Sequence, residues 1–333
     1  MILDNPGSGM VAGVDPDFSD RVAAHLDVIE ERLIDAAVAQ TPFVTEAARH
    51  VINAGGKRFR PLLVVLASLL DREAPEEDVT RAALVVELTH VASLYHDDVM
   101  DEADLRRGVP SANSRWDNSI AILVGDLLFS RASSIVATLG VEYVSLQAET
   151  FARLVHGQIA ETRGPSEGED PLEHYLAVVA DKTGSLIATS ARFGGMTARA
   201  SDEVLAALSA YGEEIGVVFQ LSDDLIDIAS DTSGKTPGTD LRAGVPTLPT
   251  LLARRSTRPE DARLLSLLDG GIEGDDDLAE ALALMRAHPA MAEARAEVER
   301  RAEVARGYLE VLPDGPARQA LSALCDTVIS RSS

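Results

Sequence analysis

The sequence predicts an all-α protein, and its composition and its apolar spacing are the two observations that predict it. Alanine, leucine, glutamate and arginine dominate the 333 residues, whereas aromatic residues make up only 4%. The dominant residues are mostly strong helix formers. Apolar residues recur at helical spacing, and no strand-like alternation extends over a useful length. We expect a single helical domain over residues 18–333 after a flexible leader over residues 1–17 that lacks the pattern of a signal peptide.

Start signals and breakers place the helices in order. The apolar spacing predicts helices over 18–39, a short helix to 53, then 62–70, 76–102, 114–139, 144–162, 172–192 and 202–230. A glycine-rich loop over 55–61 is expected to end with Pro61 in the first turn of the next helix. Residues 164–171 and 231–249 are expected to be loops, and helices with breakers complete the chain.

Charge and cysteine content exclude several classes of protein. The formal net charge of -24 argues against nucleic-acid binding through a general basic surface. Cys325 is the only cysteine, so an intrachain disulfide or a zinc cluster is impossible, which fits a reducing cytoplasm. No segment approaches the roughly 20 consecutive apolar residues that a transmembrane helix needs.

A cluster of carboxylates follows the apolar run that ends near residue 96. Helical spacing places Asp97 and Asp101 on one face, with Asp98 beside them. Like charges this close need a cation, and hard oxygen ligands suit Mg²⁺ with phosphate and water. Arg106 and Arg107 fit the phosphate part of such a site. Standing alone, the motif would more simply be a solvated acidic helix end.

A second motif of the same kind follows another apolar run and ends in Asp223, Asp224 and Asp227. Two such motifs, facing each other inside a helical bundle, would clamp one diphosphate. His90 and Gln220 each lie seven residues before an aspartate of one motif, on the same helix face.

The three lysines are a further clue. Lysine occurs only at Lys57, Lys182 and Lys235, and each lies beside a turn or a motif. A compact point charge suits phosphate.

These motifs, in this order, resemble those of the trans-polyprenyl diphosphate synthases, which elongate isoprenoid chains head to tail. The resemblance begins near residue 20 and includes Gly55-Gly-Lys-Arg-Phe-Arg-Pro61, His96-Asp-Asp-Val-Met-Asp101, Gly125-Asp126, Lys182-Thr183 and Phe219-Gln-Leu-Ser-Asp-Asp-Leu-Ile-Asp227. It implies an all-α isoprenoid-synthase bundle around a central cavity, in a homodimer.

The resemblance also assigns roles to residues. Candidate metal ligands, for about three Mg²⁺ ions, are Asp97, Asp101, Asp223 and Asp227; Asp98, Asp224 and Asp227 are expected to orient ligands and waters. The allylic diphosphate is expected to contact Arg106, Lys182 and Lys235, and isopentenyl diphosphate to contact Lys57, Arg60, His90 and Arg107. Thr183 and Gln220 are expected to stabilise the allylic cation, and the departing diphosphate to accept the proton.

One position departs from the family pattern. Many relatives have a lysine where this chain has Val245, and we expect Arg242, in the same loop, to supply that charge.

Small residues near the first motif bear on product length. Ala92 and Ser93 lie four to five residues before Asp97, where short-chain relatives carry an aromatic residue. We expect a product of six or more isoprene units, with geranylgeranyl diphosphate as the alternative. More remote alternatives are a terpene cyclase, a non-catalytic regulatory helical subunit and an acidic metal-binding scaffold.

Overall fold

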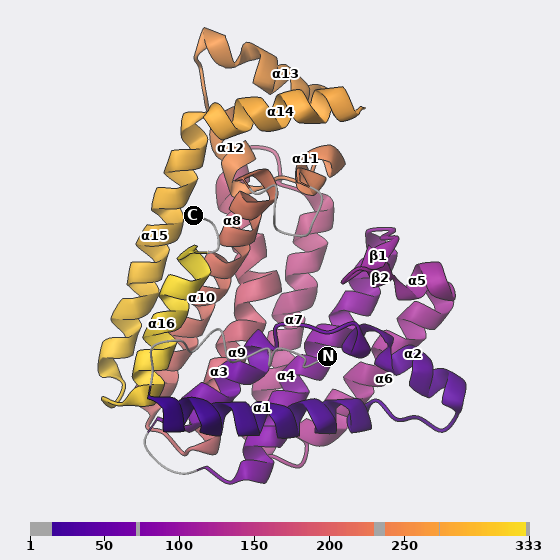
Figure 1. Cartoon of the computed structure of the whole chain (residues 1–333), viewed down its shortest axis with the longest axis vertical. Helices are drawn as coiled ribbons and strands as arrows, with labels where there is room; N and C mark the ends of the chain where they lie inside the picture. The colour runs from indigo at the N-terminus through magenta and orange to yellow at the C-terminus, as the bar shows by residue number, and fades with distance from the viewer. Residues whose placement is uncertain (1–14, 71–73, 230–236, 273, 331–333) are drawn as a thin grey trace. The chain divides into compact units, whose positions relative to one another are not determined.

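The structure is a computed structural model that describes residues 15–70, 74–229, 237–272 and 274–330 (Figure 1). The all-α prediction is confirmed, because the described residues form helices joined by loops, with one two-stranded hairpin. They divide into two compact units. Unit 1 comprises residues up to 151, 186–212 and 309–323, and unit 2 comprises residues 152–185, 213–308 and 324 onward.

Most elements belong to one unit. Unit 1 holds α1 (Pro16–Ala36), α2 (Pro42–Asn53), α3 (Phe59–Ser68), α4 (Glu76–Met100), β1 (Leu105–Arg106), β2 (Val109–Pro110), α5 (Ala112–Arg115), α6 (Asn118–Val136), nearly all of α9 (Ser185–Thr197) and a 3₁₀ turn (Leu309–Val311). Unit 2 holds α8 (Pro171–Val179), a π-helical turn (Ala180–Gly184), α11 (Thr239–Ala243), α12 (Leu248–Arg254), a 3₁₀ turn (Pro259–Asp261), α13 (Ala262–Gly270), α14 (Asp275–Ala287) and α15 (Pro289–Tyr308). The chain passes between units within α7 (Val141–Arg163), α10 (Asp202–Ala229) and α16 (Pro316–Ser330).

Some helix boundaries differ from those expected from the sequence, because a capping side chain starts the helix at another residue. The helix α1 begins at Pro16, two residues early, because the Asp15 side chain accepts a hydrogen bond from the Phe18 amide. The expected helix over 114–139 is two helices, because the Asp117 side chain accepts from the Ile120 amide and starts α6 anew. The expected loop over 231–249 contains the short helix α11.

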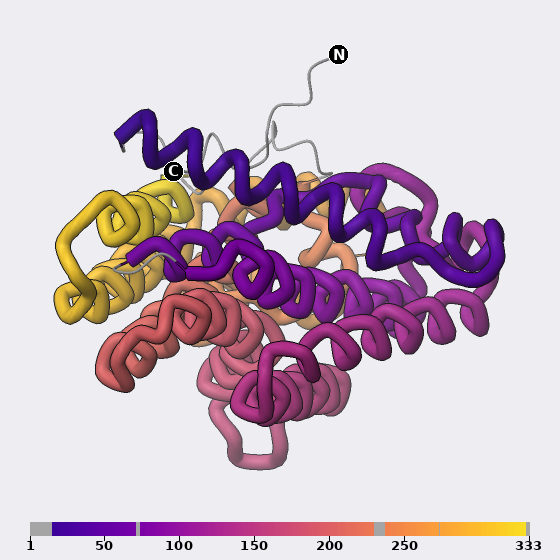
Figure 2. The backbone as a smooth tube through the Cα atoms, turned by 90° about the horizontal axis from the view of Figure 1, so that it is seen from below, coloured from indigo at the N-terminus to yellow at the C-terminus, as the bar shows by residue number. Residues whose placement is uncertain are grey.

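In unit 1, α4 is buried on nearly every side, and it contacts α1, α3 and α6 (Figure 2). A helix that is apolar all round belongs in a core. Its Leu88, Val91 and Tyr95 are fully buried. The Tyr95 hydroxyl donates to the Ala47 carbonyl at 2.5 Å, and burial raises the pKa of Tyr95 to about 12. This packing fixes the helix that ends in the first aspartate motif.

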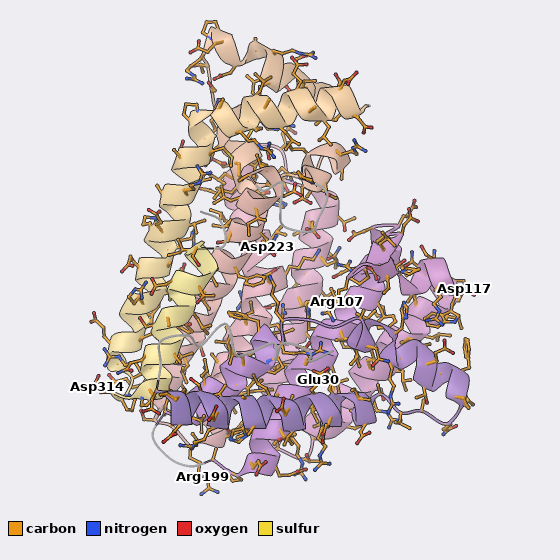
Figure 3. All side chains as sticks on the ribbon, viewed as in Figure 1. Glu30, Arg107, Asp117, Arg199, Asp223 and Asp314 are labelled. Atoms are coloured by element: carbon orange, nitrogen blue, oxygen red, sulfur yellow. The ribbon has the colours of Figure 1, made fainter. Side chains whose placement is uncertain are left out.

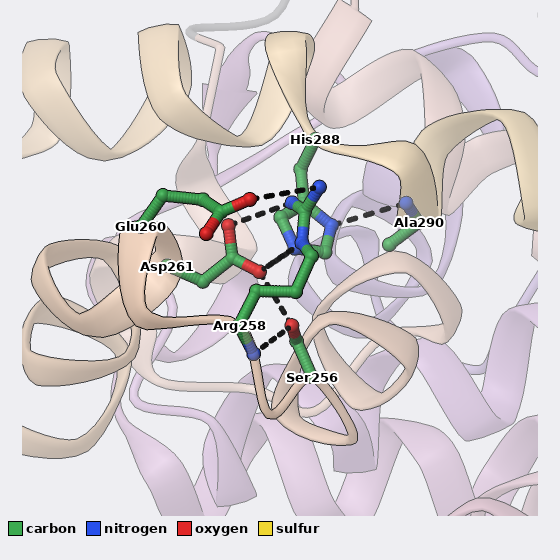
Figure 4. A network of polar contacts seen from close by, with 6 residues as sticks. All are labelled: Ser256, Arg258, Glu260, Asp261, His288 and Ala290. Atoms are coloured by element: carbon green, nitrogen blue, oxygen red, sulfur yellow. Dashed lines mark hydrogen bonds and ion pairs between the residues drawn. The ribbon is translucent and has the colours of Figure 1, made fainter.

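In unit 2, a buried carboxylate joins the segment after α12 to the start of α15 (Figure 4). Asp261 accepts two hydrogen bonds from Arg258, at 2.7 and 2.8 Å, and one from His288 at 3.1 Å. The Arg258 guanidinium and the Ser256 hydroxyl hold the pKa of Asp261 well below its usual value. Because His288 Nδ1 accepts from the Ala290 amide, its Nε2 carries the proton donated to Asp261.

Two described helices, α6 and α10, are long and apolar enough to cross a membrane by length and composition alone. A core helix of a soluble protein passes the same test, and half of the α10 window is buried inside the structure. This finding is therefore weak evidence for a membrane span.

Candidate active site

The first aspartate motif closes α4 in unit 1. Asp97 is half-buried, and Asp101, the residue that ends the helix, is exposed and donates its amide to the Asp97 carbonyl at 2.8 Å. Both side chains lie on one helix face, one turn apart. No group of three or more His, Cys, Asp or Glu residues able to hold a metal occurs within the described ranges. Two carboxylates one turn apart are hard oxygen donors of the kind that Mg²⁺ prefers, and they fit the ion as a partial ligand set completed by phosphate and water.

Asp98, between them, has a different environment. Its side chain is fully buried and accepts from Arg106 Nε at 2.7 Å. Burial raises the pKa of Asp98, and the hydrogen bond from Arg106 opposes that rise. The buried Oδ2 atom has no hydrogen-bond partner in the described part of the chain. Asp98 thus holds Arg106 beside the two aspartates.

Arg107 points to different partners from Arg106. It occupies the turn between β1 and β2 with a left-handed φ of 54°, which turns its side chain away from that of its neighbour. Its guanidinium donates to the Val51 carbonyl at 3.0 Å and to the Gly55 carbonyl. The hairpin is thereby attached to the glycine-rich loop.

Basic side chains gather at this loop and at the neighbouring helices. The pKa of Arg60 is lowered to about 10, mainly by burial and in smaller part by Arg107, with Glu87 opposing the shift. Burial, together with Arg60 and Arg107, lowers the pKa of His90 well below its usual value, so its imidazole is neutral at pH 7. Lys57 is exposed in the same loop. The cations Arg60 and Arg107, whose charged forms are destabilised by burial and by neighbouring arginines, favour an anion between them.

Two carboxylates that sequence reasoning did not select hold the loop in place. Arg58 has a left-handed φ of 49° and is buried. Its guanidinium donates to Glu30 of α1 at 2.6 and 2.7 Å and to the buried Glu87 of α4 at 3.0 Å. Figure 3 labels Glu30 and Arg107 within unit 1. The only sequence signal was the charge of Glu87 in an apolar run.

The second aspartate motif lies near the end of α10, in unit 2. Asp223, labelled in Figure 3, is half-buried, whereas Asp224 is buried. Asp224 accepts from the Tyr175 hydroxyl, from the Leu248 amide at 3.0 Å and from Gln220 Nε2 at 3.2 Å. Burial raises the pKa of Asp224 to about 7. Asp224 therefore joins α10 to α8 and α12, and Gln220 supports it from the preceding turn of α10.

Asp227 organises the loop that follows. Its carboxylate accepts from the amides of Thr239 and Asp240, both at 3.2 Å, and its carbonyl accepts from the Gly238 amide at 2.8 Å. These contacts start α11. They occupy both carboxylate oxygens with backbone donors, a role consistent with orienting the loop.

Lys182 and Thr183 lie in the π-helical turn, the kind of local irregularity that is frequent at functional sites. Thr183 is half-buried, and Lys182 Nζ donates to Glu161 at 2.5 Å. Lys235 lies outside the described residues. Arg242 forms an exposed ion pair with Asp275, the first residue of α14, and Val245 is exposed. Because exposed pairs contribute little, Asp275 does not fix Arg242 firmly.

The two residues expected to govern product length differ in packing. Ala92 is fully buried in the core cluster that α4 shares with α6. Ser93 is 8% exposed, and its hydroxyl donates to the His90 carbonyl at 2.8 Å. A large side chain at Ala92 would overpack the core, so Ser93 is the cleaner position for a test.

The expected site residues are thus brought together in two groups. Unit 1 assembles the first aspartate motif with Arg106, and the glycine-rich loop with Arg107, Arg60 and His90. Unit 2 assembles the second motif with Gln220, and the π-turn with Glu161. A separate cavity of about 800 Å³ in unit 1 is lined by residues of α2 and by Arg115, and none of the expected site residues lines it.

A helical fold in which two long helices each end in an aspartate motif defines the isoprenoid-synthase class, and solved structures of that class superpose on it. A geranylgeranyl pyrophosphate synthase from Corynebacterium glutamicum, complexed with calcium and isoprenyl diphosphate, has a TM-score of 0.87 at 43% identity, covering 96% of this chain and 98% of that one. A decaprenyl diphosphate synthase from Rhodobacter capsulatus has a TM-score of 0.85 at 32% identity, covering 95% and 98%.

Sequence comparison narrows the class to one family. The family model described as polyprenyl synthetase matches residues 41–285. A nonaprenyl diphosphate synthase from Mycobacterium tuberculosis is 49% identical over 328 residues, 97% of this chain and 98% of the relative. The chain belongs to the polyprenyl synthetase family.

Proposed function

We propose that the protein is a Mg²⁺-dependent trans-prenyltransferase that condenses isopentenyl diphosphate head to tail with an allylic diphosphate. The observation that carries this proposal is that the adjacent residues Arg106 and Arg107 bond to two different groups of residues. Arg106 joins the aspartate motif through Asp98, whereas Arg107 joins the group of Arg60 and His90. Two separate positive sites in unit 1 match two diphosphate substrates.

The residues of each group have distinct tasks. When the C–O bond of the allylic substrate breaks, the diphosphate leaves with the bonding electrons, and Arg106 and Lys182 would neutralise its charge. Mg²⁺ held by Asp97 and Asp101 would supply Lewis-acid stabilisation of that leaving group, and the family resemblance assigns a further Mg²⁺ ion to Asp223. Lys57, Arg60, His90 and Arg107 would hold isopentenyl diphosphate, whose double bond attacks the allylic carbon. The lost proton would pass to the departing diphosphate.

We propose a long product, of six or more isoprene units. The small side chains at Ala92 and Ser93 and the 49% identity to a nonaprenyl diphosphate synthase support this length. The 43% identity to a geranylgeranyl pyrophosphate synthase keeps the shorter product as a second candidate. Ser93→Phe is expected to shorten the product, as measured by mass spectrometry. An unchanged length distribution would remove Ser93 from the product path.

A homodimer is the assembly that we propose. Four apolar side chains on α6 and on the unit 1 part of α7 are exposed: Ile122, Leu123, Val141 and Val144. Val141 is 81% and Leu123 62% exposed, values that are unfavourable for large apolar side chains in water. A second copy of the chain is the occupant that the family resemblance implies.

A cytoplasmic location remains a proposal that rests on cysteine usage. Cys325, the only cysteine, is buried as a free thiol, which suits a reducing compartment. Cell fractionation with an antibody to the chain would test it.

The deciding experiment uses purified full-length protein with Mg²⁺, labelled isopentenyl diphosphate and allylic primers of several lengths. Incorporation of label into an extended diphosphate is expected. A cyclase would instead release a hydrocarbon from the primer alone, and a regulatory subunit would be inactive. The metal requirement is tested with EDTA, which is expected to abolish incorporation until Mg²⁺ is restored.

A further inference from the structure

Arg153, Gly157 and Glu161 follow one another at intervals of four residues on one face of α7. All three contact the π-helical turn, which is called the π-turn below. Arg153 Nε donates to Asp181 Oδ1 at 2.8 Å, and Glu161 Oε2 accepts from Lys182 Nζ at 2.5 Å. All of them belong to unit 2. Residues four positions apart share a helix face. Arg153 therefore pairs with Asp181, and Glu161, two turns further along α7, pairs with Lys182.

Gly157, midway between Arg153 and Glu161, lets the two elements approach. A Cβ atom at this position would lie 2.8 Å from the Lys182 amide nitrogen and 3.1 Å from Asp181 Cβ. Any larger residue would separate α7 from the π-turn. The glycine therefore sets Glu161, one turn further on, beside the Lys182 ammonium group.

The ion pair between Lys182 and Glu161 is short, but solvent and other anions can reach it. The Lys182 side chain is 24% and the Glu161 side chain 41% exposed. Such a partly exposed pair contributes little free energy and is easily replaced. A diphosphate has more negative charge and more oxygen acceptors than one carboxylate, so it would displace Glu161 from Lys182.

We propose that Glu161 is a positioning residue that holds Lys182 between turnovers and recaptures it when inorganic diphosphate leaves. This inference rests on the proposed function, in which Lys182 contacts the allylic diphosphate. Glu161 then competes with every diphosphate at this position. It keeps the cation oriented at the cost of weaker binding, and it favours release of the product.

Whether removal of Glu161 strengthens or weakens diphosphate binding distinguishes this role from others. If Glu161 only supported Lys182, its removal would weaken diphosphate binding. If Glu161 bound a metal, its removal would weaken binding in a way that added Mg²⁺ restores. Competition alone predicts that binding becomes tighter.

Isothermal titration of full-length protein with inorganic diphosphate, in Mg²⁺, measures the direction of this change without turnover. Glu161→Gln is expected to lower the dissociation constant by about two- to fivefold, the range of an exposed ion pair. Glu161→Asp keeps the charge and is expected to stay near the wild-type value. Glu142→Gln removes one charge from an exposed position on the same helix and serves as the control.

Kinetics give a second readout. In Glu161→Gln, the KM for the allylic substrate and the inhibition constant of inorganic diphosphate are expected to fall, whereas the KM for isopentenyl diphosphate stays unchanged. Equal or weaker diphosphate binding by a folded Glu161→Gln protein would overturn the inference. A wild-type protein that binds diphosphate but extends no primer would instead overturn the proposed function.

Discussion

At the scale of single residues, Asp224 shows how one aspartate of the second aspartate motif has a structural task. All its hydrogen-bond partners are donors, and they come from Tyr175, Leu248 and Gln220. The carboxyl therefore connects three helices of unit 2 at a point next to Asp223. Burial nevertheless raises its pKa to about 7, because the ionised form loses its hydration.

This shift predicts a pH dependence of stability. The folded chain binds the Asp224 proton more tightly than the unfolded chain, whose carboxyl ionises near 3.8. The free energy of unfolding should fall as the pH rises from about 4 to about 7, by at most about 4 kcal/mol from this group. Urea unfolding in EDTA at several pH values measures the slope.

Asp224→Asn isolates that contribution. The amide oxygen can accept from Tyr175 and Leu248, and Gln220 can turn its own oxygen toward the new amide group. The variant is expected to fold and to lose the part of the slope that Asp224 causes. Identical slopes in both proteins would show that Asp224 does not titrate in this window.

At the scale of elements, the crossing of α4 and α6 depends on Gly125. A Cβ atom there would lie 2.3 Å from His96 Nε2 and 3.2 Å from the Ala92 carbonyl. Gly125→Ala is therefore expected to destabilise the protein by about 1–3 kcal/mol and to lower activity, because His96 precedes Asp97. Thermal unfolding and initial rates measure both effects.

Gly270→Ala is the matched control for that change. Gly270 ends α13, and a Cβ atom there would meet no atom within 4 Å. Alanine favours helix more than glycine does, so stability should be unchanged or slightly higher. Equal behaviour of the two variants would mean that α6 can move away from His96.

The glycine-rich loop depends on the buried contact of Arg58 with Glu87. Glu87→Gln leaves Glu30 as the one carboxylate bonded to Arg58 among the described residues, beside the Ile52 carbonyl, and is expected to cost about 1–3 kcal/mol in the free energy of unfolding. The KM for isopentenyl diphosphate should rise, because the same loop carries Lys57 and leads into α3, whose first turn carries Arg60. Glu31→Gln, at an exposed position on α1, should change stability by less than about 0.5 kcal/mol. A normal KM would show that Arg58 needs only Glu30.

The helices could be predicted from the sequence because apolar spacing and caps act locally. The same spacing placed Asp97 with Asp101, and the structure has them on one face of α4. The left-handed backbone of Arg58 and Arg107 could not be predicted, since neither is glycine and distant carboxylates and carbonyls hold both side chains. The inward turn of Asp224 likewise depends on Tyr175, which lies 49 residues away.

At the scale of the whole molecule, the exposed apolar side chains of α6 and α7 predict the state of association. Leu123 is 62% exposed, so burying it against a second copy would favour a dimer. Leu123→Asp would place a charge in that contact and is expected to shift the dissociation constant upward at least about tenfold, since an unpaired buried charge costs several kcal/mol. Val311→Asp, at a 46% exposed position outside α6 and α7, should not change association. Sedimentation over a range of concentrations measures both, and a wild-type monomer would contradict the proposal.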